Sequence, residues 1–193
     1  MSETPPSDSY DQTPVPEELA ESWQVIHGYS ISIRPLRRAD LDIESAFVEG
    51  LSRETRYNRL LGGTINISRA YIEQLTTIDY SRDMALAAIV MTQESEVLIG
   101  VARYVMDSQA PEYPAPCEFA IVVADAWQGR GIGRHLMAKL IGVARGRGVP
   151  RLFGEILATN HGMLVMVKKL GFRTERHPED ATVVRATLDL QTA

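Results

Sequence analysis

The amino-acid sequence predicts an α+β (mixed α/β) fold, in which a central mixed sheet of about six to seven strands is flanked by helices. Two observations predict it. Several short segments alternate apolar and polar residues, as strands with one buried face do, whereas others repeat apolar residues at helical spacing. The two kinds of segment are interleaved along the chain, and 193 residues with 45% hydrophobic side chains suffice for one buried core.

The first half of the chain begins with a strand and continues with short helices. Residues 29–35 alternate apolar and polar side chains, which predicts the strand. Asp40 precedes a helical pattern that stops at Gly50, so we expect it to be an N-cap, and Ser52 opens a second helix that runs to about Leu61. The other elements expected here are a short helix over 68–75 and two strands over 84–91 and 97–104, joined by a turn near 93–96.

The second half contains the clearest elements. Three prolines predict a loop over 108–116, and the apolar run over 117–123, interrupted only by Glu118, predicts a strand. Helical spacing predicts a long helix over 131–146, which nearby glycines and a proline end. The remaining elements are a strand over 152–157, a helix over 160–170 closed by Gly171 and Phe172, and a strand over 183–190.

Charge and composition bound the class of protein. The first 22 residues carry six acids and no lysine or arginine, so we expect a flexible acidic arm over 1–26, with a short docking turn around Trp23, and one domain over 27–193. The rest is close to neutral, which speaks against a nucleic-acid-binding domain. A single cysteine, Cys117, excludes an internal disulfide, and no segment resembles a secretory signal or a membrane span. We therefore expect a cytoplasmic protein without membrane contact.

A glycine-rich loop joins the 117–123 strand to the long helix. Glycines at 129, 131 and 133 leave the N–H groups of a helix N-terminus accessible, and such an N-terminus binds anions. The spacing fits neither a Walker loop nor the dinucleotide fingerprint. Six basic residues and no acid between 128 and 151 suit a ligand with phosphate groups, although a solvated basic helix face would give the same pattern.

Two motifs resemble those of one enzyme superfamily. The loop, read as Gln-x-x-Gly-x-Gly over 128–133, resembles the acyl-CoA pyrophosphate loop of the GNAT N-acetyltransferases. Asn160, Met163 and the Leu-Gly-Phe ending at 170–172 resemble the later motif of the same superfamily, at the right separation. The resemblance is most specific over 117–172 and implies the GNAT fold with acetyl-CoA as co-substrate. It also implies cofactor-binding contacts from Ile121, Val122, Val123, Gln128, Gly129, Arg130, Gly131, Ile132, Gly133, Arg134 and Asn160.

Glu118 is the candidate general base, because it is the only charge in an apolar strand. A carboxylate there is costly unless it faces a cleft or is paired, and partial burial would raise its pKa toward the range of a base. Bacterial protein-lysine acetyltransferases of the superfamily resemble the chain here, with a glutamate at this place that often works through water. The alternative is a glutamate paired with an arginine. For Asn160 the alternative is a helix N-cap.

The resemblance implies direct attack of a primary amine, from a protein lysine or a small molecule, on acetyl-CoA in a ternary complex. Many relatives carry a tyrosine five residues before the final phenylalanine, where this chain has Val167, so we name no general acid. A non-catalytic acyl-CoA-binding regulatory module would keep the loop without needing Glu118. The four histidines lack metal-ligand spacing, so we expect no metal. A homodimer is common among relatives.

Overall fold

The computed structural model describes residues 14–26, 28–63, 67–93, 95–110 and 113–191. They contain one eight-stranded sheet in the order β1-β2-β3-β4-β5-β6-β8-β7. All neighbours are antiparallel except β5 and β6, which are parallel. The strands are β1 (Glu21–Ile26), β2 (Tyr29–Pro35), β3 (Met84–Met91), β4 (Glu96–Met106), β5 (Cys117–Val123), β6 (Arg151–Leu157), β7 (Arg173–Arg176) and β8 (Val183–Asp189).

The mixed α+β fold is therefore confirmed, with one or two more strands than expected. The additional strands are β1 and β7. β7 has only four residues, Arg-Thr-Glu-Arg, whose charges give no apolar alternation to read. It is a strand because its backbone pairs with β8.

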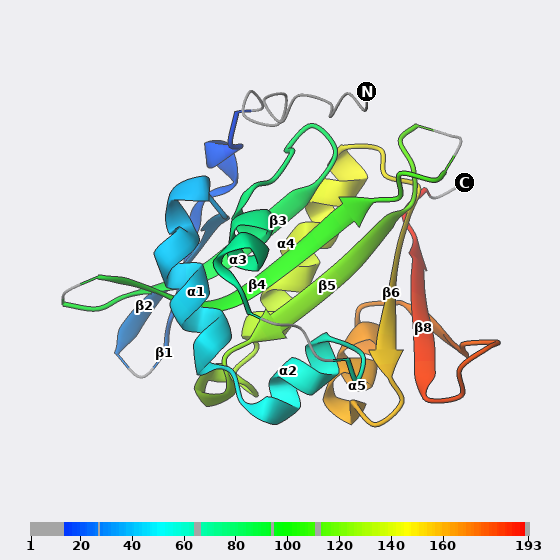
Figure 1. Cartoon of the computed structure of the whole chain (residues 1–193). Coiled ribbons are helices and arrows are strands. Elements are labelled where there is room, and N and C mark those ends of the chain that lie inside the picture. Colours follow the sequence, from blue (N-terminus) through cyan, green and yellow to red (C-terminus); the bar gives the residue numbers. More distant parts are fainter. Residues whose placement is uncertain (1–13, 27, 64–66, 94, 111–112, 192–193) are drawn as a thin grey trace, which may run out of the picture.

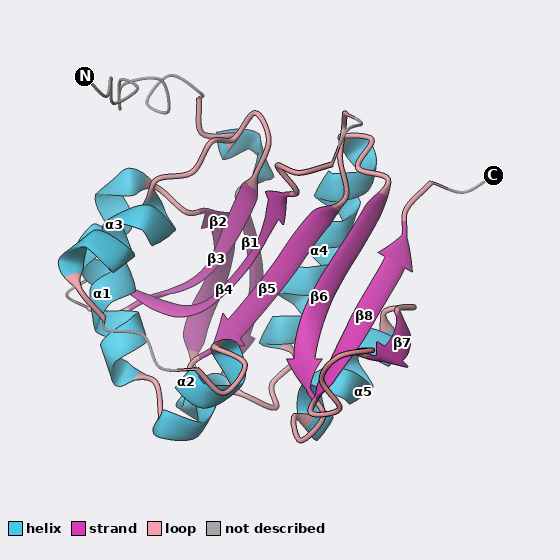
Figure 2. Ribbon diagram, turned by 45° about the vertical axis from the view of Figure 1, so that its right-hand side comes forward, coloured by secondary structure: helices cyan, strands magenta, loops and turns pink. Residues whose placement is uncertain are grey.

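Helices cover the two faces of the sheet unequally. They are α1 (Leu41–Gly50), α2 (Arg53–Arg59), α3 (Arg69–Thr76), α4 (Ile132–Gly146) and α5 (His161–Lys169), with short 3-10 turns η2 (Glu17–Leu19), η3 (Arg38–Asp40) and η4 (Asp125–Trp127). α4 lies across one face, and α1 and α3 lie on the other (Figures 1 and 2). No helix of the described residues has the length and apolar character needed to cross a bilayer.

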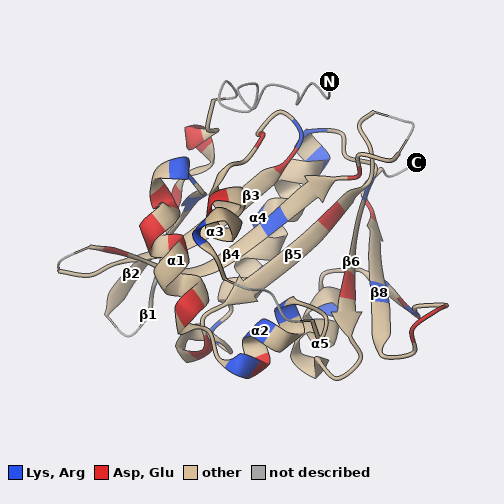
Figure 3. Cartoon of the chain, in the orientation of Figure 1, with Lys and Arg blue, Asp and Glu red and all other residues tan. Residues whose placement is uncertain are grey.

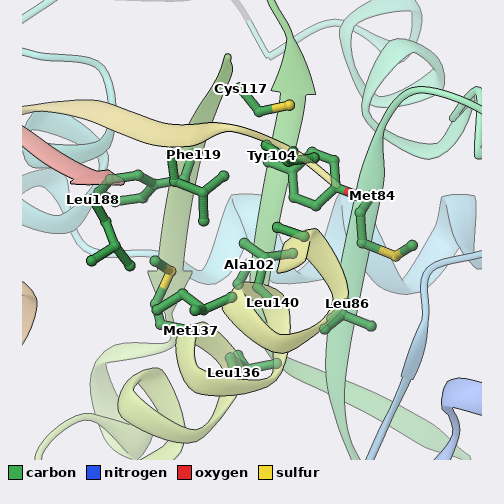
Figure 4. Close-up of a cluster of buried hydrophobic side chains, with 14 of the residues drawn as sticks. Met84, Leu86, Ala102, Tyr104, Cys117, Phe119, Leu136, Met137, Leu140 and Leu188 are labelled. Carbon is green, nitrogen blue, oxygen red and sulfur yellow. The ribbon is translucent and has the colours of Figure 1, made fainter. Parts of the chain in front are cut away.

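The main core lies between the sheet and α4. Leu136, Met137 and Leu140 are completely buried and point from α4 toward side chains of β3, β4 and β5 (Figure 4). Each such burial stabilises the fold by about 1.5–3 kcal/mol. On the opposite face, Phe47 and Leu51 belong to a smaller cluster with apolar residues of β3 and β4. On the half of that face formed by β5, β6 and β8, Figure 2 shows α2 near the ends of β5 and β6.

Of two helix starts expected from the sequence, one follows the expected chemistry and the other departs from it. The Ser52 hydroxyl accepts the Thr55 N–H at 3.1 Å at the start of α2, as an N-cap does. Asp40 precedes α1 as expected, but its side chain makes no cap bond with that helix. It instead binds the buried Arg34 guanidinium at 2.7 and 2.9 Å and accepts the Arg37 N–H. Leaving a buried guanidinium without a paired anion costs more free energy than leaving a helix without a side-chain cap.

The structure also differs from the expectation of a flexible arm up to residue 26. β1 is the edge strand of the sheet, and its Trp23 ring stacks on the ring of His135 in α4 at 4.3 Å. Glu21 lies 2.8 Å from both His135 Nε2 and Lys139 Nζ. Glu21 therefore finds its counter-ions on α4, whereas Glu17 pairs with Arg37 at 2.7 Å. Residues 1–13 lie outside the described residues.

Candidate functional site

A cleft opens where β5 and β6 diverge. Their register contains only the pairs Cys117–Leu152 and Glu118–Phe153, beyond which the two parallel strands separate (Figures 1 and 2). Residues 119–123 pair with β4 on one side and with no described strand on the other. The cleft has a volume of about 820 Å³ and extends from this free backbone edge to the glycine-rich loop. The free edge offers N–H and C=O groups to an extended ligand.

The start of α4 forms one end of the cleft. Gly131 is its N-cap with φ 86°, and Gly129 has φ 72°, a left-handed backbone region that side chains disfavour. No side chain caps the helix and its first turn contains no acid, so its first N–H groups are free to meet an anion. At Gly133 a Cβ would lie 3.5 Å from Ile121 and from Met166, which is an ordinary contact distance, so the packing around α4 does not by itself require glycine there.

The structure brings all but one of the expected site residues to this cleft. The lining includes Glu118, Ile121, Val122, Val123, Gln128, Gly129, Gly131, Ile132, Gly133, Arg134 and Asn160. Arg130 is not among the lining residues. Its Nε donates to the Ala126 carbonyl at 3.2 Å, and its guanidinium lies 5.7 Å from the centroid of the Trp127 ring. Asn160 is also the N-cap of α5, where its side chain accepts the Met163 N–H at 3.1 Å.

Gln128 and Asp125 connect the glycine-rich loop to α2 by hydrogen bonds. Figure 3 shows that α2 also carries basic residues. The Gln128 amide donates to the Val123 carbonyl at 3.0 Å and to the Thr55 hydroxyl at 3.2 Å. Asp125 accepts the Ser52 N–H at 2.9 Å and the Ser52 and Thr55 hydroxyls at 2.7 Å each. Burial acts to raise the pKa of Asp125, but these hydrogen bonds outweigh it and lower that pKa. Sequence reasoning missed this anchor, because it joins residues about seventy positions apart.

Glu118 is an exposed carboxylate on the sheet face opposite α4. Its neighbours Cys117 and Phe119 are buried in the main core, so alternation turns Glu118 to the other side. Within the described structure it makes no ion pair or hydrogen bond, which argues against the arginine-paired alternative. Partial burial, and next the negative charge of Glu155, raise the pKa of Glu118.

Glu155 on β6 is a cleft residue that the sequence analysis did not single out. It lines the cleft with Glu118 and lies 3.6 Å from both His177 Nε2 and Arg185 Nη2. The sequence contained a signal that could have identified it, because Glu155 is the only charged residue between Leu152 and Leu157. No cluster of metal-ligating side chains is present in the described part of the chain.

Comparisons with known proteins agree on one family. A family model described as the acetyltransferase (GNAT) family matches residues 58–172. The acetyltransferase PA5475 of Pseudomonas aeruginosa is 36% identical over 157 residues, which cover 81% of this chain and 82% of that protein. The acetyltransferase Pat of Mycolicibacterium smegmatis is 31% identical, over 92% of this chain and 49% of that protein.

Solved structures show the same fold. The GNAT domain of S. lividans PAT has a TM-score of 0.79 and 26% identity, and covers 91% of this chain and 99% of that domain. YncA from Salmonella typhimurium, solved with acetyl-CoA, has a TM-score of 0.64 at 19% identity, over 84% of this chain and 95% of YncA.

Proposed function

Because the chain belongs to the acetyltransferase (GNAT) family and is an acetyl-CoA-dependent N-acetyltransferase, we propose that it acetylates a primary amine by direct attack in a ternary complex, with Glu118 as the general base. One observation carries the proposal. A carboxylate without a partner among the described residues stands where β5 and β6 part, in the same cleft as the free N-terminus of α4.

The residues of the cleft suit the parts of acetyl-CoA. The N–H groups at the start of α4, in Ile132, Gly133 and Arg134, would hold the pyrophosphate. The free edge of 121–123 would pair with the pantetheine amides as a further strand does. Asn160, at the start of α5, lines the same cleft and would contact the pantetheine arm.

The chemistry needs a neutral amine, a held carbonyl and a leaving group. Glu118 takes a proton from the acceptor ammonium, directly or through a water molecule, and the amine nitrogen then attacks the thioester carbon. Backbone N–H groups of β5 would stabilise the oxyanion. The C–S bond then breaks, the attacking nitrogen releases its extra proton to solvent, and the acetyl group stays on nitrogen as an amide. Val167, where relatives often carry a tyrosine, is completely buried and has no proton to give, so the CoA sulfur leaves as thiolate or is protonated by solvent.

A Glu118→Gln substitution tests the base. We expect turnover of a lysine peptide to fall by about 10²–10⁴-fold. Acetyl-CoA affinity, measured by calorimetry, should stay within about twofold, because the amide keeps the size of the carboxylate. Unchanged turnover would remove Glu118 from this role. A wild-type protein that binds acetyl-CoA but acetylates none of a panel of protein lysines and small amines would support the runner-up, a regulatory acyl-CoA-binding module.

A further inference from the structure

Glu118 and Glu155 lie on the two diverging strands and line the same cleft. Glu118 is in register with Phe153, and in-register neighbours of a sheet share a face. Glu155 follows Phe153 by two residues, so its side chain lies on that same face. Both carboxylates line the cleft (Figure 3 marks the acidic residues of β5 and β6 in red). The cleft therefore has an acidic group on each of its two strand walls.

Arg185 of β8 and His177 lie next to Glu155. Arg185 is in register with Glu155, and its guanidinium also lies 5.1 Å from the centroid of the Phe153 ring. The Glu179 N–H donates to His177 Nδ1 at 3.3 Å, so the neutral ring carries its proton on Nε2, the atom that faces Glu155.

Glu155 retains acceptor capacity in this arrangement. Both of its ion pairs measure 3.6 Å, longer than a hydrogen bond, and within the described residues it accepts none. An ionised carboxylate has about four acceptor positions.

We propose that Glu155 is an acceptor-positioning residue, whose carboxylate binds the alkylammonium group of the incoming amine and holds it beside Glu118. The inference rests on the proposed function and names the class of acceptor, an aliphatic amine that arrives as a cation. An alkylamine such as lysine is protonated at neutral pH, since its pKa is about 10.4. One carboxylate can then attract the cation while the other removes its proton.

The charges around the cleft favour this side for a cation. Arg59 of α2 also lines the cleft, and its positive charge would repel an ammonium group that is not held by a carboxylate. The groups that act on Glu118 are the carboxylates Glu155 and Asp107 and the guanidinium groups Arg59 and Arg185. Of the two carboxylates, Glu155 lines the cleft and Asp107 does not. The negative charge of Glu155 also raises the pKa of Glu118, which makes Glu118 a better proton acceptor.

The test compares Glu155→Gln with Glu175→Gln. Glu175 is in register with Arg185 on β7, so it is the acidic neighbour of the same arginine on the side away from the cleft, and it does not line the cleft. With a lysine peptide, Glu155→Gln should raise KM about tenfold or more, with a smaller change in kcat. It should also move the acid limb of the kcat/KM profile to lower pH, because the like charge beside Glu118 is gone. Glu175→Gln should leave both KM and the acid limb unchanged. The affinity for acetyl-CoA should be the same in both variants as in wild type.

A second pair of probes separates charge from shape. The same peptide with para-aminophenylalanine in place of lysine presents an amine that is neutral at pH 7. Wild type should prefer the lysine peptide, and Glu155→Gln should narrow that preference while Glu175→Gln keeps it. Equal KM and equal acid limbs in wild type and Glu155→Gln would overturn the inference and leave the role of Glu118 untouched.

Binding of n-butylammonium gives a readout that needs no turnover. NMR shifts of the β5 and β6 amides should report its binding to wild type and to Glu175→Gln, and a loss of binding in Glu155→Gln. Absence of butylammonium binding to wild type would overturn the inference. Binding without any acetylation would keep the inference and count against the proposed function.

Discussion

Neighbouring residues of β5 acquire opposite chemistry from the two faces of one sheet. Cys117 is completely buried, and burial, followed by the charge of Asp83, raises its pKa to about 12, so it remains a thiol at neutral pH. Glu118 faces the cleft, where burial is partial and the carboxylate can ionise. Because successive side chains of a strand point to opposite faces of the sheet, Cys117 is an unreactive packing residue whereas its neighbour Glu118 is a candidate base.

The raised pKa of Glu118 predicts that its removal stabilises the fold at neutral pH. A carboxyl group with a raised folded-state pKa favours the folded state at low pH and loses that contribution as the pH rises through the folded pKa. Glu118→Gln should therefore unfold at a higher urea concentration than wild type at pH 7, and at a similar concentration at pH 4. Urea titrations at the two pH values check this, and a lower midpoint for the variant at pH 7 would contradict it.

Among the elements, two glycines show how differently a strand and a helix respond to one methyl group. At Gly154 in β6, an added Cβ would lie 2.8 Å from the Phe119 ring, which packs edge-on against Phe172. At Gly142 in α4, nothing lies within 4 Å and the position is exposed. The first site depends on the missing side chain and the second does not.

Gly154→Ala should destabilise the protein by about 1–3 kcal/mol through overpacking. Gly142→Ala should stabilise it by about 1 kcal/mol, because alanine is the better helix former. Urea unfolding of both variants measures the two free energies. Equal changes in the free energy of unfolding for the two variants would mean that the Phe119 ring moves aside without an energetic cost.

The sequence predicted those elements whose periodicity is local. The long helix and the strand before it could be read from apolar spacing, and all the site residues but Arg130 reach the cleft. β1 and β7 could not be predicted, because edge strands need only backbone partners. The Asp125 anchor could not be predicted either, because it depends on how α2 packs against the loop.

For the whole molecule, the cleft predicts strong coupling between ligand binding and stability. A ligand that binds only the folded state, at about one hundred times its Kd, adds about 2.7 kcal/mol. For a chain of 193 residues this corresponds to a rise in Tm of about 5–10 °C. Thermal unfolding with acetyl-CoA should show this rise. Acetyl-pantetheine, which lacks the pyrophosphate, should give a smaller one at equal concentration, and equal shifts would argue against the α4 N-terminus as the pyrophosphate site.

The short register between β5 and β6 has a geometric consequence. The sheet divides into two plates, β1–β5 and β6–β8, that meet at a corner formed by the Cys117–Leu152 and Glu118–Phe153 pairs. Any small rotation of one plate about that corner displaces the far end of the gap most, where Val123 leads into the glycine-rich loop, and the corner least. Glu118 stands at the apex of the angle. Such a rotation would change the width of the cleft for a long ligand while Glu118, the proposed base, stayed almost stationary.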